Sequence, residues 1–114
     1  MKVYKGTIDS GEMNWEVTVD DKPLPFRLDL ANHSPDGFSW GYSGSGCAQL
    51  ALAMLANHFG DDEKALNLYQ DFKFACIVKF PMNKGFEINS DDVQKIVDTF
   101  LFWQNFMVTR GLNV

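Results

Sequence analysis

The sequence lacks long hydrophobic runs, clustered cationic residues and a dense set of cysteines, and each absence excludes a class of protein. No apolar stretch approaches the roughly 20 residues that span a bilayer, and no export signal is recognisable. The formal net charge is −5, whereas non-specific phosphate binding needs clustered Lys and Arg. Two cysteines allow at most one disulfide, far fewer than bridge-dependent secreted domains contain. We therefore expect a cytoplasmic protein with reduced cysteines, no membrane association and no nucleic-acid partner.

Short metal-binding motifs are missing as well. Two His and two Cys could supply four zinc ligands in principle, at His33, Cys47, His58 and Cys76. No Cys-x-x-Cys or His-x3-His pair is present among them, although zinc sites usually have such spacings. The sequence predicts neither a metal nor a cofactor.

The chain does contain enough apolar material for one core. Of its 114 residues, 46% are hydrophobic and 22% charged, which are the proportions of a folded domain. It has no repeat, linker or low-complexity segment. We expect a single domain over 1–114, β-rich over 1–43, helical over 45–107 and ending in a tail over 108–114.

Period-two alternation predicts strands in the first third. Trp15, Val17 and Val19 alternate with polar residues, and a turn-forming stretch separates them from β-prone residues, which predicts a hairpin. Alternating apolar residues predict a third strand and a short fourth one. The expected strands are 2–8, 15–20, 26–30 and 38–42.

Three helices are predicted in the remainder. Segment 47–59 is apolar on nearly every side, with Ser43 or Ser45 as its cap and Gly60 at its end, which is typical of a central helix. Two amphipathic helices with acidic first turns follow. One starts near Asp61 and stops before Pro81, and the other starts at Asn89 or Ser90 after a short extended link over 86–88. The expected fold is α+β: a small N-terminal antiparallel sheet of three to four strands packed on three helices.

A glycine-rich turn over 41–46 leads into the first helix. Main-chain N–H groups at a helix N-terminus favour anions, so this turn could hold a nucleotide or phosphate. It matches neither a P-loop nor a dinucleotide fingerprint, and glycines that let the helix approach the sheet closely explain it without a ligand. We favour that structural interpretation. The candidate ligand-binding residues, which we expect to converge around the turn, are Ser34, Trp40, Tyr42, Gly44, Ser45, Gly46 and Gln49.

A catalytic cysteine is conceivable at the same place. Cys47 lies in the first helical turn, where the dipole lowers a thiol pKa in general, and His33 lies in a loop that could approach it. Lone cysteines are more often simply buried, so we predict no catalytic residue and favour a non-enzymatic protein. His58, near the end of the same helix, complements the helix dipole.

The C-terminal segment holds more large apolar side chains than one helix face can bury. They are Phe102, Trp103, Phe106 and Met107. Aromatic and Met side chains are enriched where subunits meet, so the segment predicts a two-fold homodimer. The alternative is that these rings cover the open side of the N-terminal sheet within one chain.

The central part of the chain resembles a family of small bacterial and phage-encoded proteins of unknown function. The resemblance is carried by the segment Asn-His-Ser-Pro-Asp-Gly-Phe-Ser-Trp-Gly-Tyr-Ser-Gly-Ser-Gly-Cys-Ala-Gln-Leu-Ala-Leu-Ala over 32–53, and it extends from Val3 to the region of Ser90. Cys47 stands where the family pattern usually has Pro, which can do no nucleophilic chemistry. The resemblance implies a link to phages, plasmids and other mobile elements, and no activity or cofactor.

Two functions remain open from the sequence. The first is a protein-interaction or accessory module of a mobile element, with a host protein or a second copy as partner. The second is a domain that binds an anionic ligand at the glycine-rich turn. We favour the first.

Overall fold

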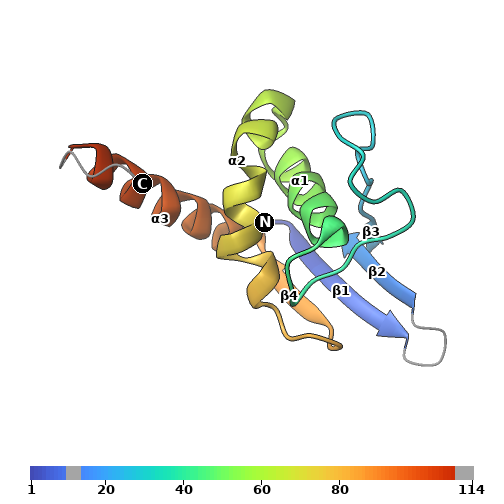
Figure 1. The fold of residues 1–114 in the computed structure, drawn as a ribbon. Coiled ribbons are helices and arrows are strands. Elements are labelled where there is room, and N and C mark those ends of the chain that lie inside the picture. The colour runs from blue at the N-terminus through green and yellow to red at the C-terminus, as the bar shows by residue number, and fades with distance from the viewer. Residues whose placement is uncertain (10–13, 110–114) are drawn as a thin grey trace.

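The computed structural model describes residues 1–9 and 14–109, with side chains through Met107. The elements run in the order β1 (Val3–Asp9), β2 (Asn14–Val19), β3 (Lys22–Pro23), α1 (Ser45–Phe59), α2 (Asp62–Ala75), the 3-10 turn η1 (Ile77–Lys79), β4 (Phe86–Asn89) and α3 (Ser90–Thr109). The expected α+β fold is confirmed, with one antiparallel sheet and three helices (Figure 1). None of the helices in the described part of the chain is long and apolar enough to cross a membrane.

The sheet has the strand order β3-β2-β1-β4, all antiparallel. The predicted hairpin is confirmed, since β1 and β2 pair from Tyr4↔Val19 to Asp9↔Asn14. Alternate residues such as Tyr4 and Val17 are buried on the face that packs against the helices. The opposite face carries exposed polar residues such as Lys5 and Glu87, whose charged groups lie 3.5 Å apart.

Two of the predicted strands do not form. Residues 26–30 make a turn, because Pro25 lacks an N–H and Arg27 has a positive φ of 59°, which ends any ladder. Residues 38–42 carry no strand either: Phe38 and Trp40 pack into the core from a loop, while Tyr42 is exposed. The fourth strand is instead β4, the segment predicted as an extended link, where Phe86 and Ile88 are buried.

The helices form close to the predicted bounds. α1 is buried at every position from Gly46 to Ala56 and lies across one face of the sheet, with α2 beside it (Figure 1). Neither Ser43 nor Ser45 caps it, because its N-cap is Gly44 with no side-chain hydrogen bond. Gly60 ends it as predicted, with a φ of 63°.

The two later helices both use a side-chain cap. Asp61 Oδ1 accepts a hydrogen bond from Lys64 N at the start of α2, and Asn89 Oδ1 accepts one from Asp92 N at the start of α3. α2 ends at Ala75, earlier than predicted, and η1 completes the connection toward Pro81. α3 continues to Thr109, two residues into the predicted tail, and the rest of that tail lies outside the described residues.

Candidate functional site

The connection between β3 and α1, residues 24–44, contains neither helix nor strand. Connections of this length inside a compact domain are uncommon, and they are usually either functional or linker segments. We call this segment the long loop. It holds most of the candidate ligand-binding residues, so its attachments determine what the site can do.

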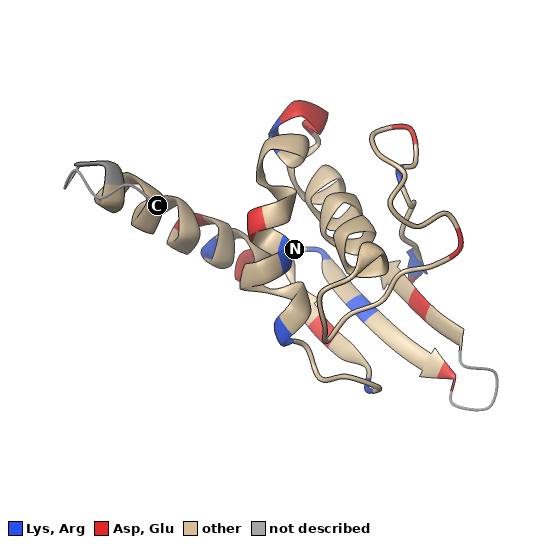
Figure 2. Ribbon diagram, viewed as in Figure 1, with Lys and Arg blue, Asp and Glu red and all other residues tan. Residues whose placement is uncertain are grey.

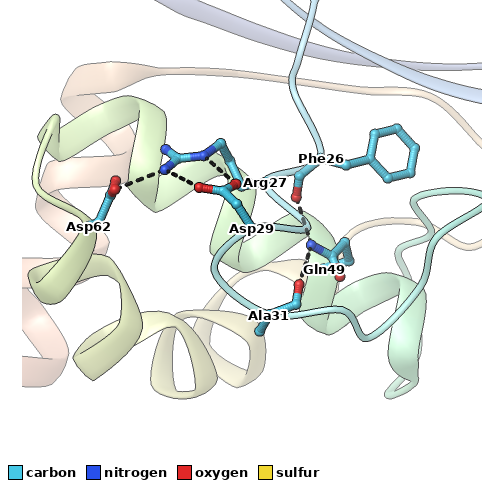
Figure 3. Close-up of polar contacts among 6 residues, drawn as sticks. All are labelled: Phe26, Arg27, Asp29, Ala31, Gln49 and Asp62. Carbon is cyan, nitrogen blue, oxygen red and sulfur yellow. Dashed lines mark hydrogen bonds and ion pairs between the residues drawn. The ribbon is translucent and has the colours of Figure 1, made fainter.

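Gln49 of α1 anchors the long loop. Its side chain is fully buried and makes four hydrogen bonds to loop main-chain groups. Oε1 accepts from His33 N at 2.8 Å and from Ser34 N at 3.2 Å. Nε2 donates to Phe26 O at 2.6 Å and Ala31 O at 3.1 Å (Figure 3). One side chain thus satisfies both donors and acceptors of a loop that has no ladder of its own.

Arg27 makes a second attachment, at the surface. Its guanidinium lies 3.0 Å from Asp29 in the loop and 2.8 Å from Asp62 at the start of α2 (Figure 3). The hydrogen bond from Arg27 lowers the pKa of the Asp29 carboxyl. These ion pairs are exposed, so they position the loop and contribute little to stability.

The aromatic side chains of the loop extend the core. Trp40 is fully buried, and its ring centroid lies 4.8 Å from that of Trp15 and 4.9 Å from that of Phe86. Its Nε1 donates a hydrogen bond to Lys84 O. Phe38 stacks on Phe26 with ring centroids 4.2 Å apart. Trp40 is therefore accounted for by packing between the sheet and the link to β4.

The glycines of the turn make room for side chains. A Cβ on Gly44 would lie 2.6 Å from the ring of Tyr42, and a Cβ on Gly46 would overlap Ser39 Oγ. Tyr42 Oη also donates to Ser39 Oγ at 3.0 Å. These neighbours belong to the long loop, so Gly44 and Gly46 make room for the loop and not for an approach of α1 to the sheet.

The predicted convergence is partial. Ser34 and Gln49 meet directly, and Ser34 Oγ also donates to Gly37 O. Trp40 bonds to the link before β4, while Ser45 and Tyr42 are exposed. Anion binding at the turn stays a prediction that this geometry does not strengthen.

Cys47, His33 and His58 each have a different side-chain partner. Cys47 is fully buried beside Ser39, whereas His33 Nε2 lies 2.8 Å from Tyr69 Oη on α2. His58 Nε2 lies 2.7 Å from Gln94 Oε1, and this contact joins α1 to α3. Burial raises the pKa of Cys76 to about 12. Within the described ranges, no group of three or more His, Cys, Asp or Glu could hold a metal ion.

A groove of about 260 Å³ lies between β2 and the long loop, and no motif in the sequence predicted it. Its walls combine the rings of Trp15, Phe26 and Phe38 with the carboxylates of Glu16 and Asp36. The groove exists because β3 ends after two residues and the chain then turns away from β2. We call it the β2 groove.

The C-terminal half of α3 projects away from the sheet and from the other helices (Figure 1). Phe102 is 60% exposed and Trp103 52% exposed, while Phe106 and Met107 are partly buried. The three rings contact one another with centroids 5.5 to 6.4 Å apart. The alternative that these rings cover the sheet of their own chain is therefore wrong.

A second groove, of about 560 Å³, adjoins these rings between α2 and α3. Phe74, Phe100 and Trp103 line it, and Gln104 Nε2 donates to Asp71 at its edge. Phe74 is itself 55% exposed. We call the four predicted interface residues together with Phe74 and Phe100 the α3 surface.

Comparison with known protein families identifies the family of this chain. Neither the curated proteins nor the solved structures contain a match to this chain. A family of unknown function, DUF6166, matches residues 4–99, which include the sheet, the long loop, α1, α2 and the first half of α3. The exposed rings of α3 lie beyond that match. Because the match covers most of the chain, this protein belongs to the DUF6166 family of unknown function.

Proposed function

We propose that this protein is a non-enzymatic interaction module that associates with a second copy of itself through the α3 surface. The single observation that carries the proposal is the projecting end of α3, where large rings are exposed. From Thr99 to Thr109 the helix has no charged residue. Exposed apolar patches of several hundred Å² on a single domain usually mark a site of association.

The available area suits a small isologous interface. Aromatic side chains bury about 150–250 Å² each when fully covered, so the exposed fractions of Phe74, Phe102 and Trp103 amount to roughly 350 Å² per copy. Two copies would bury ~700 Å² from these rings alone, and Phe100, Phe106 and Met107 add enough to approach the ~1,000 Å² of a specific interface.

The charge pattern favours a second copy over a strongly charged partner. Each chain carries a net charge of −5, which opposes association in general. The projecting half of α3 contributes none of that charge, so a contact there brings few acidic residues together, and Asp71 at the edge of the groove accepts a hydrogen bond from Gln104. In a two-fold pairing the same surface of both copies meets, so Trp103 of each copy would lie in the interface.

Light scattering at micromolar concentration tests the proposal. We expect twice the monomer mass for the unmodified chain and the monomer mass for Trp103→Glu. Met82→Glu is the matched control, since Met82 is also 52% exposed and lies outside the α3 surface. A monomeric unmodified chain, or a dimer that survives Trp103→Glu, would refute it. The link to mobile elements that the resemblance implies is a separate proposal, which genomic neighbourhood tests.

A further inference from the structure

β2 is longer than the strand that covers its outer edge. It has six residues, whereas β3 has two and pairs only with Thr18 and Val19. Leu24 N donates to Val17 O at 3.0 Å, and then Pro25 ends the pairing because it has no N–H. The strand position beside residues 14–16 is therefore vacant among the described residues.

The main chain of β2 presents bonding groups toward this vacancy. Since Val17 O accepts from Leu24, the main chain of Val17 faces away from β1. Alternate residues of an antiparallel strand face the same edge, so the N–H and C=O of Trp15 do as well. In the described part of the chain, no main-chain hydrogen bond reaches Trp15 from that side. Unpaired edges of this kind accept an added strand.

The β2 groove runs along this edge and offers side-chain contacts. It is lined by Trp15, Glu16, Val17 and Thr18, consecutive residues from both faces of β2. On the other side stand the stacked rings of Phe26 and Phe38. An extended segment placed here would alternate its side chains between an apolar, ring-lined side and the solvent face.

The acidic side chains that line the β2 groove favour a segment with a cationic side chain. Its lining includes two carboxylates, Glu16 and Asp36, both exposed, and no Lys or Arg. Figure 2 shows acidic positions on β2 and on the loop beside it. The nearest cations in sequence are Lys22, which lies in β3, and Arg27, which is paired with acidic residues elsewhere.

We infer that the β2 groove binds an extended segment of a partner protein, which adds a strand beside β2 and pairs a Lys or Arg side chain with Glu16 or Asp36. Main-chain hydrogen bonds to the N–H and C=O of Trp15 supply the docking register. The rings of the groove stabilise the stem and the charge of the cationic side chain. This surface shares no residue with the α3 surface, so the inference is independent of self-association.

A displayed library of random ten-residue peptides, selected on the full chain, supplies the probe. The selected peptides are expected to carry Lys or Arg within an alternating apolar pattern. The best one is then synthesised with a fluorescent label, and its binding is followed by polarisation. Methylating alternate main-chain nitrogens of that peptide abolishes strand addition while keeping its charge, so we expect binding to be lost.

Two double variants of equal net charge test the carboxylates. Glu16→Gln with Asp36→Asn is expected to weaken binding by roughly threefold to fivefold, since the exposed ion pair to either carboxylate is lost. Glu63→Gln with Asp91→Asn removes two exposed carboxylates from α2 and α3 and is expected to leave binding unchanged. All four positions are exposed, so circular dichroism should show both variants folded.

Several results would overturn the inference. They are a library without enrichment, peptides without a cationic residue, and binding that the first double variant leaves unchanged. Binding that Trp103→Glu abolishes would assign the peptide to the α3 surface instead. A dimer that the peptide converts to monomers would show that a second copy occupies the β2 edge, which also contradicts a separate protein partner.

Discussion

Replacing Gln49 with Met should release the long loop while leaving the volume of the core nearly unchanged. The fully buried amide makes four hydrogen bonds to main-chain groups of the loop, and Met can make none of them. The loop has no ladder to take over these groups. The expected effect is a large loss of stability from a substitution of similar shape.

The size of the loss follows from the number of bonds. At about 1 kcal/mol for each hydrogen bond, four bonds give roughly 4 kcal/mol, and water reaching the half-buried His33 and Ser34 reduces this to about 2–4 kcal/mol. A domain of this size has a free energy of unfolding of about 5–15 kcal/mol in total. Urea unfolding should therefore show a midpoint lower by roughly 1–3 M.

Hydrogen exchange reports on the bonds themselves. The amides of His33 and Ser34 donate to Gln49 Oε1, so their protection should fall in Gln49→Met well before that of α1. Gln49→Glu keeps those acceptors but turns a carboxylate toward the carbonyls of Phe26 and Ala31. Its stability should be low at neutral pH and recover partly in acid, where the protonated carboxyl can donate again.

Gln70→Met on the exposed side of α2 is the matched control, and it should change the urea midpoint very little. The role assigned to Gln49 would be refuted by a loss below about 1 kcal/mol, the contribution of a single hydrogen bond. Unchanged exchange at His33 and Ser34 would refute it equally.

Two further predictions concern packing and alkaline pH. Gly6→Ala should destabilise the chain by about 1–3 kcal/mol in urea unfolding, because the new methyl group would overlap the buried ring of Phe86. Gly37→Ala meets nothing within 4 Å, so it should be neutral or slightly stabilising, and equal effects of the two would contradict the packing. Burial raises the pKa of Cys76 to about 12, against about 8.5 in an unfolded chain, so the unfolded state loses its proton first and stability should fall as the pH rises from about 9 to 12. Cys76→Ala should make the loss of stability with rising pH less steep. Part of the loss should remain, because burial also raises the pKa of Tyr4. An unchanged slope would contradict the role given to Cys76.

The sequence predicted those strands and helices that depend on residues close together in the chain. The hairpin follows from alternation in β1 and β2, and α1 follows from its run of apolar helix formers. The strand expected at 26–30 was wrong because the alternating residues lie in a turn, where Phe26 and Leu30 pack against the core and Leu28 is exposed. β4 was read as a link because its partner, β1, lies far away in sequence.

The candidate site was only partly predictable for the same reason. Gln49 could be singled out because it is a polar residue within an apolar helix, although its four partners could not be named. Glu16 and Asp36 carried no signal, since neither belongs to a motif. Their proximity depends on where β3 ends, and that depends on the three-dimensional path of the long loop.

The pairing of β1 with β4 affects how the chain can fold during synthesis. β1 is a central strand of the sheet, yet one of its two neighbours begins only at Phe86. The main chain of Lys2 also bonds to Ser90, at the start of α3. A growing chain therefore exposes a strand edge on β1 until about three quarters of its length has been made, and contacts this far apart in sequence form slowly. Folding of the whole domain is thus delayed until late in translation, and chains that stop before β4 would carry an open edge prone to aggregation.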